Sequence, residues 1–99
     1  MARQIPLSTL GEILRAEFLE PMGISQYALA RAIDVPPRRI NEIVKGERAV
    51  SADTAVRLGA YFDMDPQFWM NLQTHYATTM AAEKIGPAKL KEMHRHATA

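Results

Sequence analysis

The sequence predicts an all-α fold of five helices, and three observations carry this prediction. Apolar residues recur at helical spacing in five successive stretches, rather than in the alternation typical of strands. Each stretch follows a residue type that favours the start of a helix. Two of the stretches are short and are joined by a tight turn. We expect one compact domain, with a radius of gyration near ~13 Å for this chain length.

We divide the single domain of residues 1–99 into three parts. Residues 1–7 lack periodicity, so we interpret them as an N-terminal arm. Residues 8–83 form the folded core. Residues 84–99, in which a glycine–proline pair interrupts the helical pattern, form a basic tail that could be helical over 88–96 and to which we assign no function.

The first predicted helix follows Thr9, which forms a capping-box pattern with Glu12. Its apolar residues continue at helical spacing until Pro21 and Gly23, which we expect to end the helix. We interpret this helix as scaffold.

The next two helices lie between Ser25 and Gly46. Ser25 is a favourable N-cap, and we expect Asp34 to adopt the left-handed backbone that usually requires glycine. Pro36 and Pro37 fix the start of the following helix, because proline is favoured at the first helical position and holds the residue before it extended. Gly46 is expected to end that helix.

The helix that begins at Pro37 has two faces on a helical wheel. Ile40 and Ile43 lie on the side that must face a core. The opposite side carries a polar stripe: Arg38, Asn41 and Lys45, with Glu42 beside them. Arginine can pair bidentately with guanine and asparagine with adenine, so such a stripe is typical of a helix that reads the DNA major groove. It could instead be an ordinary solvated face.

The candidates for DNA contact come from these two helices and the loop after them: Gln26, Pro37, Arg38, Arg39, Asn41, Glu42, Lys45 and Arg48. We expect Arg39 and Arg48 to contact phosphates, while Gln26 could bind a phosphate or simply be exposed. Glu42 could accept a hydrogen bond from cytosine, but we favour an ion pair with Arg38 or Arg39 one turn back.

The last two predicted helices begin after Ser51 and Asp65. The fourth buries a stripe that includes Ala55 and Leu58. The fifth has a broad apolar strip and a second strip with small residues, which is typical of a helix that also packs on a second copy of the chain. We assign these residues to a homodimer interface: Trp69, Met70, Gln73, Ala77 and Ala81.

Composition excludes several classes of function. Twelve Lys and Arg against eleven Asp and Glu leave a net charge of +1, so the chain as a whole has no strong electrostatic attraction to nucleic acid. The absence of cysteine excludes thiolate metal sites. With no nucleophile and paired base and no phosphate-binding glycine loop, we predict no enzyme and no cofactor. His94 and His96 could bind a metal weakly, but we assign no metal site. We expect a cytoplasmic protein without a membrane partner, because no apolar run reaches membrane length and no secretory signal is evident.

The spacing of the helix-turn-helix motif is matched by six residues: Gln26, Ala30, Asp34, Val35, Ile40 and Ile43. The segment resembles the Cro/repressor-like (XRE) DNA-binding domains. The stretch from Gly11 to Gln73 more closely resembles the HigA-type antitoxins of bacterial toxin–antitoxin pairs. The similarity lies in GEIL, FLEP, VPP, RINEIV, the Asp53-Thr54-Ala55 run and the Phe68-Trp69 pair. The chain departs from the pattern at Asp34, where the superfamily usually has glycine, and at Leu10, where this group often has proline.

The resemblance implies a five-helix Cro/repressor-like domain with a C-terminal dimerisation helix, acting as a homodimer on double-stranded operator DNA. It also implies repression of its own operon and neutralisation of a cognate HigB-like toxin, usually a small ribonuclease. Two alternatives stay open. One is a plain helix-turn-helix transcriptional repressor without a toxin partner, and the other is a protein-interaction module that does not read DNA.

Overall fold

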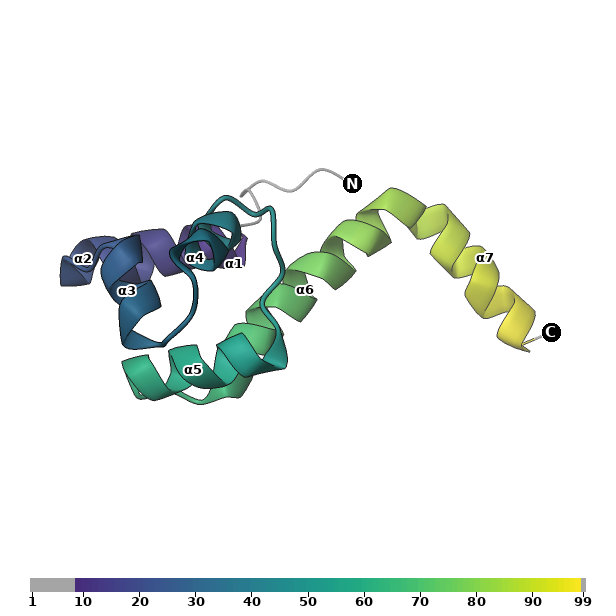
Figure 1. Cartoon of the computed structure of the whole chain (residues 1–99). Helices are drawn as coiled ribbons and strands as arrows, with labels where there is room; N and C mark the ends of the chain where they lie inside the picture. Colours follow the sequence, from purple (N-terminus) through teal and green to yellow (C-terminus); the bar gives the residue numbers. More distant parts are fainter. Residues whose placement is uncertain (1–8, 99) are drawn as a thin grey trace.

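The computed structural model describes residues 9–98, and within this range the regular secondary structure is all helical, without a strand (Figure 1). The prediction of an all-α fold is confirmed. The predicted arm, residues 1–7, lies outside the described residues. The elements in order are α1 (Leu10–Ile13), η1 (Leu14–Leu19), α2 (Glu20–Met22), α3 (Gln26–Ala32), α4 (Pro37–Val44), α5 (Ala52–Phe62), α6 (Pro66–Ile85) and α7 (Pro87–Thr98).

The first predicted helix is continuous through α1, η1 and α2. It passes through Pro21 and ends at Gly23, whose φ of 67° is left-handed. The middle part, η1, is a π-helix, and the N–H of Glu20 donates to the carbonyl oxygen of Arg15, five residues earlier. The wider turn accommodates the proline ring, which would otherwise clash with a carbonyl one turn back.

The predicted helix starts are confirmed. Thr9 and Glu12 form a reciprocal capping box, and the Oγ of Ser25 accepts a hydrogen bond from the N–H of Ala28 at 3.0 Å. α4 begins at Pro37, as its proline pair predicts. α5 and α6 start after capping side chains at the predicted positions, Ser51 and Asp65.

The turn between α3 and α4 is held on two sides. Asp34 adopts the predicted left-handed conformation, with φ 60°. The N–H of Val35 then donates to the carbonyl oxygen of Ala30 at 3.0 Å, which satisfies an acceptor at the end of α3. From α5, the Nη1 of Arg57 donates to the carbonyl oxygen of Ile33 at 2.8 Å. The angle between α3 and α4 is therefore fixed by local geometry and by a neighbouring helix.

Trp69 is at the centre of the core, and this corrects its assignment to the dimer interface. Its side chain is 0% exposed and its ring centroid lies 5.0 Å from Phe18, 5.1 Å from Phe68 and 5.9 Å from Phe62. A side chain enclosed by its own chain has no area left for a second copy. The other buried apolar residues are Leu10, Leu14, Leu19, Leu29, Ala30, Ile33, Val35, Ile40, Ile43, Val50, Ala55 and Leu58.

The C-terminal part of α6 and all of α7 project from this core (Figure 1). The principal extents are 55 × 26 × 22 Å and the radius of gyration is 16.8 Å, so the expectation near ~13 Å for a compact chain was wrong. The reason is that α6 runs for 20 residues and continues beyond the core, where Gly86 turns the chain into α7. Large apolar side chains are exposed along the projecting part: Met80, Ile85, Leu90 and Met93. No helix within residues 9–98 is long and apolar enough to cross a membrane.

Backbone packs directly on backbone where α1 meets the end of α4. A Cβ added to Gly11 would lie 2.2 Å from the carbonyl oxygen of Ile43 and 2.7 Å from that of Val44. These distances are too short for any side chain, so only glycine allows the two helices to approach this closely.

We predict that Gly11→Ala lowers the free energy of unfolding by about 1–3 kcal/mol, because the added carbon forces α1 away from α4. Helix propensity alone would give the opposite sign, since alanine is favoured over glycine by about 1 kcal/mol. Urea denaturation measures the change. Ala16→Gly, at an exposed position of the same helical run, is the control for the propensity term. A Gly11→Ala variant as stable as the wild type would rule out the close contact.

Candidate nucleic-acid interface

α4 presents one polar face to solvent. Burial of Ile40 and Ile43 against the core turns the opposite side of the helix outward. Arg38, Asn41 and Lys45, the predicted stripe, are all exposed. Pro37 is also exposed at the start of the helix, and Arg39 is half-buried at its flank. The stripe predicted from the sequence therefore lies on one accessible surface.

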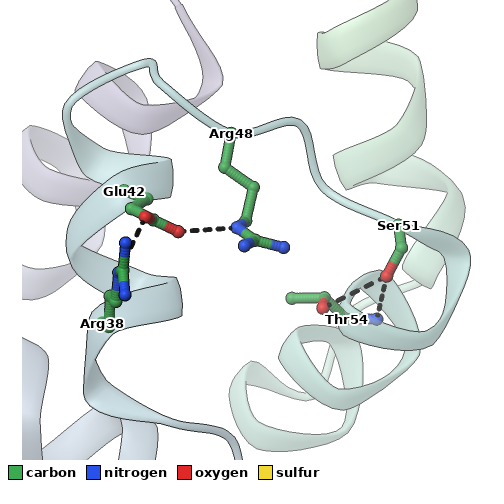
Figure 2. Close-up of polar contacts among 5 residues, drawn as sticks. All are labelled: Arg38, Glu42, Arg48, Ser51 and Thr54. Carbon is green, nitrogen blue, oxygen red and sulfur yellow. Dashed lines mark hydrogen bonds and ion pairs between the residues drawn. The ribbon is translucent and has the colours of Figure 1, made fainter.

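Glu42 holds two arginines (Figure 2). Its Oε2 accepts a hydrogen bond from the Nε of Arg38 at 3.1 Å, and its Oε1 accepts one from the Nε of Arg48 at 2.8 Å. The predicted ion pair with Arg38, one turn back, is confirmed, whereas Arg39 is not a partner. The pairing with Arg48 was not predicted, because that residue comes from the loop after the helix and not from the helix itself.

The two arginines lower the pKa of Glu42 below its ordinary value of 4.5. The hydrogen bond from Arg48 is the largest cause, burial opposes it by raising the pKa, and the hydrogen bond from Arg38 adds to the lowering. A depressed carboxyl pKa means that the ion pairs contribute stability above the ordinary value. That contribution is lost as the pH falls through the pKa of the folded state.

This cluster forms a shallow, positively charged depression of 280 Å³ on the outer face of α4. It is lined by Pro36, Arg38, Arg39, Glu42 and Arg48. Three arginines against one glutamate give the lining a net charge of +2, although the chain as a whole carries only +1. A concave basic surface of this kind suits a phosphate or another anion.

A side-chain bond connects α3 to the polar face of α4. The Nδ2 of Asn41 donates to the Oε1 of Gln26 at 3.2 Å, across 15 residues of sequence. Gln26 is half-buried and Asn41 exposed, so the pair lies at the edge of the same surface. No sequence signal indicated this pairing, although both residues were candidates separately. Whether Gln26 also binds a phosphate stays a prediction.

Gln73 has a role that the sequence did not reveal. Its Nε2 donates to the carbonyl oxygen of Val50 at 2.8 Å, and its Oε1 accepts from the N–H of the same residue. α6 thereby holds the loop that carries Arg48. We expected Gln73 at a dimer interface; within this chain both ends of its amide bind the backbone of Val50, and its place at an interface stays a prediction.

The remaining dimer candidates lie on the surface of α6. Ala77 and Ala81 are exposed, while Met70 is half-buried against the core.

In the described part of the chain, no group of three or more potential metal ligands occurs. His94 and His96 are exposed on α7.

Comparison with known proteins agrees with this geometry. Residues 14–69 match the model of a family described as Helix-turn-helix. The chain belongs to the helix-turn-helix family. Within that family it is of the HigA type, so the resemblance inferred from the sequence is confirmed. Membership of this family also supports the prediction that the chain is not an enzyme.

Three relatives show how far the similarity extends. Virulence-associated protein I of Dichelobacter nodosus is 52% identical over 80 residues, 81% of this helix-turn-helix chain and 74% of that protein. Antitoxin HigA-1 of Vibrio cholerae is 40% identical over 65 residues, 66% of this chain and 61% of the antitoxin. The structure of Pseudomonas aeruginosa antitoxin HigA with the higBA promoter is 49% identical, with a TM-score of 0.77 over 82% of this chain and 88% of that one.

We predict that the Glu42 carboxyl titrates below 4.5 and that Arg48→Ala raises its pKa more than Arg38→Ala does, because Arg48 is the larger cause of the shift. NMR titration of the side-chain carboxyl measures all three values. Arg39→Ala, which removes a neighbouring charge without removing either hydrogen bond, is the control. A larger effect from Arg38→Ala than from Arg48→Ala would contradict the assignment.

Proposed function

We propose that this chain is a DNA-binding antitoxin that represses its own operon and neutralises a cognate toxin. The observation that carries the DNA-binding part is the exposed stripe of Arg38, Asn41 and Lys45 on α4, the second helix of the motif. Support also comes from the solved HigA relative, which is bound to promoter DNA. Since its target is operator DNA, we place the protein in the cytoplasm.

In this proposal α4 lies in the major groove. Arg38 pairs with a guanine and Asn41 with an adenine, the partners that match their donor and acceptor geometry. Arg39 and Arg48, at the flank of the helix and in the loop after it, contact phosphates and fix the position of the helix on the duplex. Pro37, Gln26 and the start of α3 border the same surface.

The proposed active form is a homodimer assembled through α6. Ala77 and Ala81 are small and exposed, which allows close approach of a second helix. Ala77 also lines a mainly apolar groove of 220 Å³ between α1, the loop after α4, and α6.

A two-fold dimer with one DNA-reading helix per subunit needs half-sites about one helical turn, ~34 Å, apart or a multiple of it. Occupation of such a site blocks transcription sterically.

Toxin neutralisation is supported by the names of the relatives, among them the antitoxins of Vibrio cholerae and Pseudomonas aeruginosa. By this likeness the partner would be a HigB-like toxin encoded beside the chain. Expression of the adjacent gene with and without this chain tests it. Growth arrest that co-expression relieves supports the proposal, whereas an adjacent gene without toxicity leaves a plain transcriptional repressor.

We predict that Arg38→Ala and Arg39→Ala weaken operator binding in different ways. Loss of a bidentate contact from Arg38 should cost about 1–3 kcal/mol per half-site and relax the preference at one symmetric pair of positions. Loss of a phosphate contact from Arg39 should weaken all sequences alike and make the salt dependence shallower by roughly one unit per contact. Titrations against the operator and single-base variants at two salt concentrations measure both effects.

Lys91→Ala, an exposed cation on α7, is the control for the loss of one positive charge away from α4. Operator binding that both arginine variants leave intact would place α4 outside the groove. It would favour a protein-interaction module that does not read DNA.

We predict that Ala81→Glu converts a dimer into a folded monomer, because Ala81 is exposed in the single chain and a buried glutamate would be unpaired in the interface. Light scattering gives the mass and circular dichroism the helix content. His75→Glu, also exposed on α6 but about 120° round the helix, should leave the dimer intact. A wild-type protein that is monomeric at micromolar concentration would rule out this interface.

A further inference from the structure

One carboxylate binds two of the three arginines on the proposed DNA-binding surface. Glu42 uses each oxygen on a different side chain, Oε2 on Arg38 and Oε1 on Arg48. Arg38 comes from the same helix and Arg48 from the loop beyond it, so Glu42 also connects the loop to the helix (Figure 2). Only 20% of the Glu42 side chain is exposed, while 87% of Arg38 and 49% of Arg48 are.

The atoms used in these bonds decide what is left for a ligand. In both arginines the donor is Nε, the nitrogen nearest the backbone. A guanidinium has five N–H donors, and four of them belong to the two terminal nitrogens. Those terminal nitrogens form the fork that pairs with two acceptors on a guanine edge or on a phosphate. Glu42 therefore restrains each arginine without occupying its fork.

We propose that Glu42 is the positioning residue of this surface. It holds Arg38 ready for a base, which contributes sequence preference, and Arg48 ready for the adjacent phosphate, which fixes the position of the helix. This inference rests on the proposed DNA-binding function. Glu42 itself is a negative charge facing a polyanion, so its effect on affinity for DNA in general is unfavourable. The same residue therefore raises the preference for the operator and lowers the affinity for DNA in general.

The expected change in Kd follows from the restraint that Glu42 places on each arginine. An unrestrained arginine loses rotamer freedom when it binds, which corresponds to roughly a two- to tenfold weaker Kd for each side chain. Direct reading of cytosine by Glu42 would use the second lone pair of an oxygen that already accepts one hydrogen bond from arginine, and a double variant with Arg38→Ala distinguishes the two roles.

The test measures Kd for the operator, for single-base variants and for an unrelated duplex at one salt concentration. Glu42→Gln is compared with Glu47→Gln, which removes the same charge from an exposed position in the loop after α4. Both variants should bind the unrelated duplex more tightly. Only Glu42→Gln should lose preference for the operator, by roughly two- to tenfold at the base pair that each released Arg38 reads, because a phosphate contact from Arg48 carries no preference.

Glu42→Asp separates charge from position. It keeps the negative charge but shortens the side chain by one methylene, so it should lose preference without gaining affinity for the unrelated duplex. Helix content and thermal unfolding of each variant establish that it is folded. In the Arg38→Ala background, Glu42→Gln should cause no further loss of preference at the base pair that Arg38 reads.

Two results would overturn the inference while leaving DNA binding intact. One is an operator preference in Glu42→Gln equal to that in Glu47→Gln. The other is a loss at a single base pair that persists in full in the Arg38→Ala background, which would make Glu42 a direct reader. A wild-type protein without any preference for the operator would instead refute the proposed function itself.

Discussion

The close approach of α1 to the end of α4 at Gly11 is the constraint on which the proposed DNA-binding surface depends. With no side chain between them, the backbone of α1 rests against the last carbonyl groups of α4. α4 is then fixed along its length, at its start by the turn after α3 and at its end by this contact. Because Ile40 and Ile43 face inward from a helix held at both ends, the direction of Arg38 and Asn41 is set by the core.

Features fixed by neighbouring residues could be predicted from the sequence. The capping box at Thr9, the left-handed Asp34 and the start of α4 at Pro37 each depend on a few adjacent side chains with strong backbone preferences. The exposed polar stripe on α4 could also be predicted, because helical periodicity places its residues opposite the apolar ones. The ion pair between Arg38 and Glu42 is also local, at a spacing of four residues.

Contacts between distant residues could not be predicted. The bonds of Gln26 with Asn41 and of Gln73 with Val50 join residues 15 and 23 apart, and many pairings of polar side chains are compatible with one sequence. Trp69 was assigned to the wrong surface because a helical wheel separates faces but does not say which face meets the core. The length of α6 beyond the core likewise depends on what lies around it.

Side-chain contacts to the loop after α4 link α6 to α4. Gln73 holds both backbone groups of Val50, and Arg48, two residues earlier, reaches Glu42 on α4. The helix proposed for dimerisation and the helix proposed for reading DNA therefore share a set of contacts. Most members of this set are polar side chains near the surface.

Asp34 affects stability through the unfolded chain as well as through the folded structure. A non-glycine residue in the left-handed region is strained, and aspartate is among those that tolerate it best. Glycine would remove this strain, but it would also give the unfolded chain more conformations to lose on folding, a term of about 0.4–1 kcal/mol. Asp63, with φ 56° at the end of α5, has the same two opposing terms. The ends of these helices thus owe part of their stability to the limited conformational entropy of the denatured chain.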